Sequence, residues 1–260
     1  AFLLAAAQRA LGPDNVIAAT VVSPSLATGE LESARAFADD LGVRHIAVRG
    51  AEIERPGYRK NARDRCAHCK TELMEVLLPI AESNFGANAL VATGTNADDS
   101  ADPNRPGMAA AGRLGAVTPL AAVRMSKSEI RRLSRDWGLT TWNKPQAACL
   151  ASRIAYGVPV TEAGLQRVDR AEAQLRHLFD VEAIPVTDLR VRDLGADSAR
   201  VEVDAALVSR VVAVELQMFE VLRSEGFVDG ELDPRGFRSG SLNEPVLLTL
   251  DLPTTVSSRR

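Results

Sequence analysis

The sequence has few cysteines and no long apolar run. Three cysteines in 260 residues are too few, and odd in number, for the disulfide framework of a secreted scaffold. We therefore expect a cytoplasmic protein whose thiols stay reduced and serve a function. No apolar run reaches the roughly 20 residues that a membrane-spanning helix needs. We accordingly expect no membrane association.

The sequence also lacks a charge excess and the common phosphate-binding motifs. A net charge of −3 and a pI near 5.8 argue against a general affinity for nucleic acids or anionic membranes. Neither G-x-G-x-x-G nor G-x-x-x-x-G-K-[ST] is present, which excludes a dinucleotide fingerprint and a Walker phosphate loop. The chain opens at Ala1 inside an apolar helix without an N-terminal cap, so we expect further sequence upstream.

Helices and strands alternate in the first half of the chain. Hydrophobic periodicity predicts helices over residues 1–11, 30–41, 69–84 and 126–137, and strands over residues 16–22, 45–48 and 89–92. The strand over 16–22 is continuously apolar, which is typical of a strand buried on both faces. This alternation predicts an α/β domain with a parallel sheet and right-handed crossovers.

The pattern of predicted elements changes after residues 157–159, where we place a domain boundary. The pattern beyond it predicts helices over residues 161–178 and 205–224, and strands over residues 188–191, 199–203 and 228–239, the last mixed with loop. These elements predict a smaller α+β domain.

The three cysteines form the most informative pattern. Cys66 and Cys69 make a C-x-x-C motif in a connection that leads into a helix, and Cys149 follows 80 residues later. A C-x-x-C directs two sulfurs from one helical turn at a single point. A third thiolate would complete a site with one open coordination position. The alternative is a buried Cys149 unrelated to the motif. His68, inside the motif, is badly placed to be a ligand itself.

A polar loop follows the strand predicted at residues 89–92. Its Gly94 turn is followed by Asp98, Asp99 and Asp102, and carboxylate oxygens suit Mg²⁺. Because ligands of parallel sheets bind at the carboxyl ends of strands, a metal site is expected here. A solvated loop with a turn glycine is the alternative.

Two further segments gather reactive or cationic groups. The irregular stretch over 142–157 contains Cys149, Ser152 and Arg153, and such loops are site candidates. Arg190 and Arg192 share one face of a strand, where paired guanidinium groups suit a phosphate or a carboxylate. A solvent-facing, salt-bridged hairpin is the alternative, and the cationic loop around Arg238 has the same ambiguity.

Several segments, in their order and spacing, resemble the LarE family of ATP-dependent sulfur transferases, which belong to the PP-loop ATP pyrophosphatases. The matching segments are residues 96–107, 140–145, 149–153, 156–157, 189–192, 200–203 and 236–240. The resemblance implies a Rossmann-like PP-loop domain (adenine nucleotide alpha hydrolase-like) over residues 1–156. A substrate-binding α+β domain is then expected over residues 157–260.

The resemblance also implies a reaction. Family members adenylylate a carboxylate of pyridinium-3,5-biscarboxylic acid mononucleotide with ATP and Mg²⁺, release pyrophosphate and insert sulfur. The product is a thiocarboxylate on the path to the nickel-pincer nucleotide cofactor. One branch sacrifices the sulfur of a cysteine at the position of Cys149 and leaves dehydroalanine. Another holds a 4Fe–4S cluster on three cysteines, and Cys66, Cys69 and Cys149 look like that branch.

Other residues match positions of known role in the family. Ser152, Arg190 and Arg192 match positions that hold the substrate phosphate, and Arg238 matches a basic position in the same region. Glu172 and Glu202 match acidic residues near the site of sulfur transfer, where Cys149 is also expected to act. The full set of expected binding residues is Ser152, Arg153, Arg190, Arg192, Arg238, Gly94 and Asp98.

One departure from the family concerns its phosphate loop, Ser-Gly-Gly-x-Asp-Ser, which should stand immediately before Ala1 and is absent. We interpret this as an N-terminal truncation. Two alternatives remain: a PP-loop enzyme that thiolates tRNA, which the acidic charge balance disfavours, and a non-enzymatic metal- or sulfur-binding protein. We expect a homo-oligomer without a nucleic-acid partner, and the sequence does not identify the sulfur donor.

Overall fold

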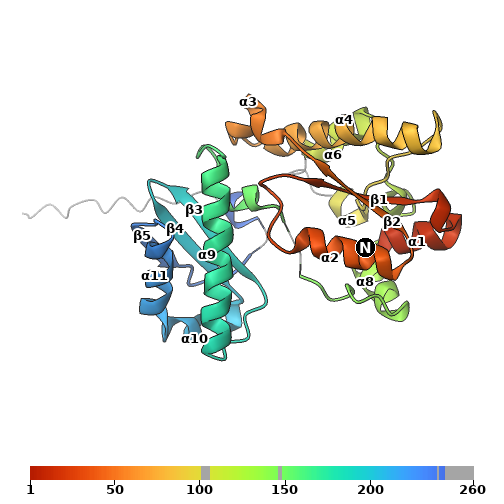
Figure 1. Ribbon diagram of the computed structural model, residues 1–260. Coiled ribbons are helices and arrows are strands. Elements are labelled where there is room, and N and C mark those ends of the chain that lie inside the picture. The colour runs from red at the N-terminus through yellow and green to blue at the C-terminus, as the bar shows by residue number, and fades with distance from the viewer. Residues whose placement is uncertain (101–105, 146–147, 239, 244–260) are drawn as a thin grey trace, which may run out of the picture.

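The computed structural model describes residues 1–100, 106–145, 148–238 and 240–243. The chain forms two lobes, one around a parallel pair of strands and the other around a three-stranded sheet (Figure 1). Within the described part of the chain, no helix combines the length and apolar character needed to cross a bilayer.

The first lobe has helices on both faces of its strands. β1 (Ile17–Val22) pairs in parallel with β2 (Arg44–Arg49), and α2 (Glu30–Asp40) connects them. α1 (Phe2–Leu11) and α2 lie on one side of this pair, and α4 (Arg65–Phe85) lies on the other (Figure 1). The α/β alternation predicted for this half is therefore confirmed. The remaining helices of the lobe are α3 (Pro56–Arg59), α5 (Ala97–Ser100), α6 (Pro106–Arg113), α7 (Pro119–Ala122) and α8 (Lys127–Asp136).

Two predictions about strands in this lobe are wrong. β1 is half-buried, with Ala19 exposed, because only β2 pairs with it among the described residues. Residues 89–92 form no strand, and Ala92 makes only an isolated parallel bridge to Val117. Pro119 starts α7 two residues beyond Val117 and has no N–H to donate, which keeps this pairing short.

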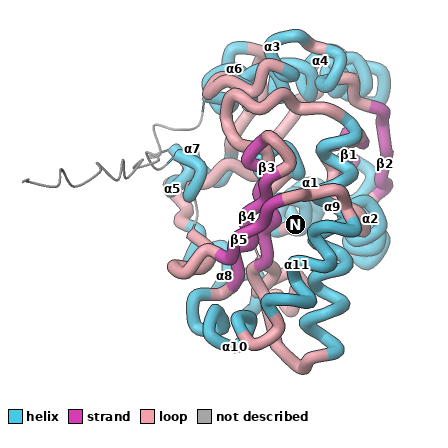
Figure 2. Tube along the Cα trace, turned by 90° about the vertical axis from the view of Figure 1, so that its left-hand side faces the viewer, coloured by secondary structure: helices cyan, strands magenta, loops and turns pink. Residues whose placement is uncertain are grey.

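The second lobe contains a mixed sheet covered on one face by helices. β3 and β4 are antiparallel, while β4 and β5 are parallel. α9 and α11 cover one face of this sheet (Figures 1 and 2). Its elements are α9 (Glu162–Val181), β3 (Leu189–Gly195), β4 (Ser198–Val203), α10 (Val208–Val212), α11 (Glu215–Ser224) and β5 (Asp229–Leu232).

The single helix predicted over residues 205–224 is wrong as well. A short 3₁₀ turn, Ala205–Leu207, precedes α10, and Val214 leaves the helical region with φ −116° before α11 begins. The run of β-branched residues at Val211, Val212 and Val214 favours such an interruption. Val211, Val214 and Met218, on either side of the break, all face the core.

The core of the second lobe extends back into the segment that carries Cys149. The buried stripe of α9, which includes Val168 and Leu175, packs in the same cluster as Leu150, Ala151 and Ile154. Ile154 also bridges to Asp193 of β3. The residues just after Cys149 are thus part of the packing of the second lobe, upstream of the boundary predicted at residue 157.

Candidate functional site

The C-x-x-C lies in the first turn of α4, because the helix begins at Arg65 and not near Cys69 as predicted. Residues three apart on a helix share a face, so both thiols lie on the same side of this turn. Gly107 of α6 approaches closely here, and a Cβ on it would lie 2.8 Å from the carbonyl oxygen of Cys66. A side chain at position 107 would therefore collide with the backbone of α4.

The three cysteines are free thiols in neighbouring positions. Cys66 and Cys149 are exposed, whereas Cys69 is half-buried against the core of the second lobe. Burial raises the pKa of Cys69 to about 12, and the nearby Cys149 and Cys66 add to this shift. Burial also raises the pKa of Tyr58, again with a contribution from Cys149. The thiols therefore lie close enough for their charges to interact.

The chemistry of this donor set fits an iron–sulfur cluster. Among the described residues, no three Cys, His, Asp or Glu side chains converge on the position of a single metal ion. A cluster binds each thiolate through a different iron, so its ligand sulfurs are spaced more widely than those around one ion. Three neighbouring thiols, two from one helical turn, are the number and kind of ligands that such a cluster needs.

Three arginines from three elements bind the backbone carbonyls of the segment that carries Cys149. Arg153 donates to the carbonyl oxygens of Ala148 and Cys149, the latter at 3.1 Å. Arg65 donates to Ala151 O at 2.7 Å, and Arg192 donates to Ser152 O at 3.0 Å. This segment forms a 3₁₀ turn, Leu150–Arg153, and the arginines fix its position between the lobes.

Arg153 and Glu172 form a buried ion pair behind this turn. Arg153 Nε and Nη2 donate to the two carboxylate oxygens of Glu172 at 2.9 and 3.1 Å. Glu172 Oε1 also accepts from the backbone N–H of Val191 at 3.0 Å. Glu172 belongs to the buried stripe of α9, so the pair ties that helix to both β3 and the Cys149 segment. Their predicted binding and catalytic roles stay predictions.

Arg192 and Glu202 form a second buried pair across the β3–β4 ladder. Arg192 Nε and Nη2 donate to one Glu202 oxygen at 3.1 and 2.7 Å. The other oxygen accepts from Ser241 Oγ at 2.7 Å, and Glu202 is 0% exposed. Arg190 and Arg192 are both buried, so this strand pair is not the solvent-facing hairpin of the alternative interpretation.

Arg190 lies in an environment that disfavours its charge. Its guanidinium lies 5.0 Å from the centroid of the Phe237 ring, and Nη1 donates to Leu189 O at 2.6 Å. Burial lowers the pKa of Arg190 to about 10, and the charges of Arg153 and Arg192 contribute. An anion bound here would favour the charged form of Arg190.

A cavity of about 130 Å³ joins these elements. It is lined by residues of the Cys149 segment, β3, the start of α4 and the C-terminal loop: Arg65, Ala148, Ser152, Ile154, Tyr156, Arg190, Arg192, Phe237, Gly240, Ser241 and Leu242. The structure thus brings together Ser152, Arg190 and Arg192, which the sequence proposed for the substrate phosphate. Arg238 does not line it, but pairs with Asp233 at 3.2 Å.

Sequence reasoning missed Asn61 and Arg65. Asn61 is 0% exposed with a φ of 54°, a left-handed conformation that asparagine tolerates better than most residues. Its Nδ2 donates to the carbonyls of Ala155 and Val158 at 2.8 and 2.7 Å, and its Oδ1 accepts from Arg65. The only signal in the sequence was that Asn61 and Arg65 are polar residues four positions apart, with Arg65 directly before Cys66.

The polar loop after Gly94 uses its carboxylates for backbone contacts. Asp98 Oδ2 accepts from Lys127 N at the start of α8 at 2.8 Å, and Asp99 Oδ2 accepts from Asn96 N at 3.1 Å. Asn96 Oδ1 in turn accepts from both aspartate amides. Asp102 lies outside the described residues. The Mg²⁺ site proposed at Gly94 and Asp98 stays a prediction.

Comparison with known proteins places the chain in a family. No family profile matches it. It is 39% identical over 231 residues to an uncharacterized protein of Synechocystis, covering 88% of this chain and 82% of that protein. It is also 30% identical over 234 residues to the pyridinium-3,5-bisthiocarboxylic acid mononucleotide synthase of Lactiplantibacillus plantarum, covering 90% of this chain and 81% of the synthase. The chain therefore belongs to the family of that synthase, the LarE family that its motifs resemble.

Proposed function

We propose that the protein is an ATP-dependent sulfur transferase that converts carboxylates of pyridinium-3,5-biscarboxylic acid mononucleotide into thiocarboxylates. The observation that carries this proposal is the cavity shared by two buried arginines of β3 and the segment that bears Cys149. The arginines suit a nucleotide phosphate, and the adjacent thiols suit sulfur chemistry. The name of the synthase from L. plantarum supports the product class.

The proposed reaction needs activation because a carboxylate oxygen is a poor leaving group. Transfer of AMP from ATP with Mg²⁺ converts that oxygen into part of a good leaving group, and pyrophosphate is released. Sulfur attack on the acyl carbon then expels AMP. Arg190 and Ser152 would hold the phosphate of the substrate, while the hydrogen bonds to Glu202 orient Arg192 at the cavity wall.

Cys66, Cys69 and Cys149 would hold a 4Fe–4S cluster. Such a cluster, when bound by three thiolates, supplies one iron with an open position for the sulfur that is transferred. The contribution of this chain is the placement of the thiols. α4 presents Cys66 and Cys69 from one turn, and the arginine contacts described above hold the Cys149 segment next to them.

The test of the proposed function is product formation. The full-length protein is purified anaerobically and incubated with ATP, Mg²⁺, a sulfide source and pyridinium-3,5-biscarboxylic acid mononucleotide. We expect pyrophosphate release that depends on the nucleotide, and a thiocarboxylate product detected by mass spectrometry. Pyrophosphate release on a tRNA substrate instead would show that the proposed substrate class is wrong.

Arg190→Gln is expected to weaken substrate binding. Loss of a charge-assisted contact to the phosphate should cost about 1.5–3 kcal/mol of binding free energy. Lysine at this position should restore binding poorly, since one ammonium cannot replace a planar fork. Calorimetric titration measures the binding, and thermal unfolding reports stability. Arg200→Gln, on the neighbouring strand and paired with the exposed Glu231, is the control. Unchanged affinity in Arg190→Gln would leave Arg190 a structural residue.

A further inference from the structure

Arg65 is a buried cation for which the described residues supply no counter-charge. It is 5% exposed, and no carboxylate among the described residues pairs with it. The other two arginines that bind the Cys149 segment differ, because Arg153 has Glu172 and Arg192 has Glu202. Burial of a guanidinium without an anion is costly, so an arginine in this position calls for an explanation.

The guanidinium of Arg65 is anchored on one side only. Nη1 donates to Asn61 Oδ1 and to Ala151 O, at 2.7 Å in the second case. Nε and Nη2 make no hydrogen bond to a described residue, and neither nitrogen is fully buried. Both nitrogens are therefore open to accessible space, and Arg65 lines the cavity.

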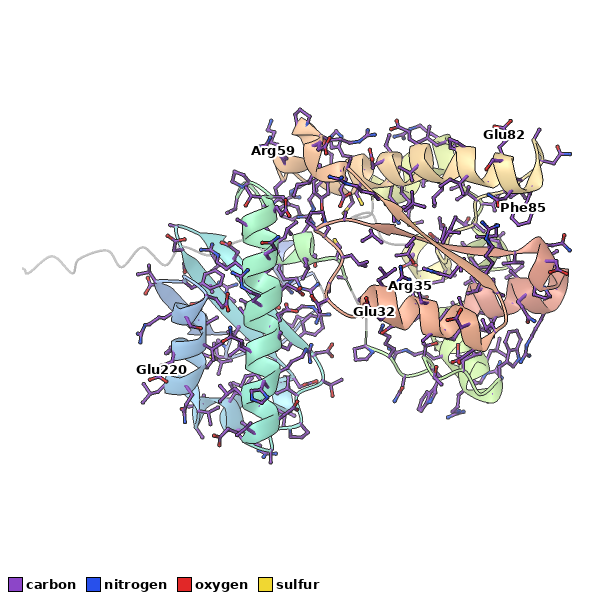
Figure 3. All side chains as sticks on the ribbon, in the orientation of Figure 1. Glu32, Arg35, Arg59, Glu82, Phe85 and Glu220 are labelled. Carbon is purple, nitrogen blue, oxygen red and sulfur yellow. The ribbon has the colours of Figure 1, made fainter. Side chains whose placement is uncertain are left out.

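The position of Arg65 in the cavity differs from that of the β3 arginines. Arg65 and Arg192 bind the adjacent carbonyls of Ala151 and Ser152, so they approach the same turn from two different elements. Arg65 belongs to α4, directly before Cys66, and its guanidinium lies 5.7 Å from the centroid of the Tyr156 ring. Figure 3 shows the α3–α4 corner, with Arg59 labelled, facing the lobe of α9. This arrangement gives the cavity a cationic group on the thiol side and a second cationic group on β3.

From these observations we infer that Arg65 is a specificity-determining residue that binds a carboxylate of the pyridinium substrate. This inference rests on the proposed function, in which the substrate carries a phosphate and two ring carboxylates. With the phosphate on β3, a carboxylate on Nε and Nη2 of Arg65 supplies the missing counter-charge. A planar guanidinium edge matches a carboxylate in two parallel hydrogen bonds. Tyr156 offers an aromatic face beside that contact.

The contact with a carboxylate predicts a measurable preference between two simple ligands. Nicotinic acid mononucleotide carries a ring carboxylate, whereas nicotinamide mononucleotide carries a neutral amide of nearly the same shape. Calorimetric titration of the wild-type protein should show that the acid binds at least about tenfold tighter, because only the acid forms the charge-assisted pair. Arg65→Gln should bring the ratio of the two affinities close to one, and Arg65→Lys should leave it intermediate.

Two controls separate this role from general effects. Arg63→Gln removes an exposed cation two residues away and should keep the wild-type ratio. Arg190→Gln should weaken both nucleotides by the same factor, because both carry the phosphate. Thermal unfolding shows whether Arg65→Gln is folded, and the wild-type ratio tests the inference without any variant.

The outcomes are distinguishable. Equal binding of the two nucleotides to the wild-type protein would overturn the role of Arg65 and leave the proposed function standing. A preference for the acid that survives in folded Arg65→Gln would also overturn it, and would place the carboxylate on another residue. Failure of both nucleotides to bind would overturn the inference together with the proposed substrate. A preference lost only in the Arg65 variants supports it.

Discussion

Glu202→Gln is expected to lower the free energy of unfolding by about 3–5 kcal/mol. Glu202 is 0% exposed and accepts two hydrogen bonds from Arg192 and one from Ser241. Glutamine keeps the shape but removes the charge, so Arg192 is left buried without its anion. Urea denaturation, followed by circular dichroism, measures the loss.

A matched control lies on the same sheet. Arg200 is the register partner of Arg192 and pairs with Glu231 of β5 at 2.5 Å, but Glu231 is 55% exposed. Glu231→Gln should therefore cost less than about 1 kcal/mol. The two substitutions make the same chemical change and differ in burial.

A double variant tests the reason for the loss. In Arg192→Met/Glu202→Met the uncompensated charge is gone, so it should be more stable than Glu202→Gln. If the double variant were the less stable of the two, packing and hydrogen bonding would dominate at this position. An equal loss in Glu202→Gln and Glu231→Gln would show that burial does not control the strength of the Arg192 pair.

The parts of the fold that the sequence predicted are those determined by local patterns. The helix predicted over residues 126–137 is α8, and a local capping box of Ser126 and Glu129 defines its start. The helix predicted over residues 161–178 is α9, and the strands predicted over residues 188–191 and 199–203 are β3 and β4. The prediction of a strand at residues 89–92 was wrong because a strand forms only with a partner strand. Here the pairing is limited to one bridge between Ala92 and Val117.

The candidate site divides in the same way. Ser152, Arg190 and Arg192 stand out in the sequence as a hydroxyl in an irregular segment and a cationic pair on one strand face, and the structure brings them to one cavity. Arg65 gave no such signal. Its interest depends on the contrast with Arg153 and Arg192, which have Glu172 and Glu202 as partners, and that contrast is a property of the folded chain. Glu172 and Glu202 differ from Arg65, because the sequence named them through the family resemblance. The structure adds that both are buried partners of arginines.

Cys149→Ala, Cys66→Ala and Cys69→Ala are each expected to abolish sulfur transfer, because each removes one of three ligands of the proposed cluster. Wild-type protein reconstituted under anaerobic conditions should be brown and carry about four irons per chain, as a 4Fe–4S cluster requires. Each variant should lose the colour and most of the iron. Iron analysis, visible absorption and thiocarboxylate formation measure the three effects.

His68→Ala is the matched control for the cysteine variants. His68 lies inside the C-x-x-C, but its ring packs against Gly57 and its Nε2 lies 3.5 Å from Asp64 Oδ2. Its loss should leave iron content and sulfur transfer near those of the wild type.

The exposed thiol of Cys149 allows a different outcome, in which this cysteine donates its own sulfur and becomes dehydroalanine. Full activity in Cys66→Ala and Cys69→Ala, with loss of sulfur from Cys149 after one turnover, would establish that sacrificial route. It would leave the C-x-x-C without a role in transfer, since a donor that is consumed needs no second thiol to hold it.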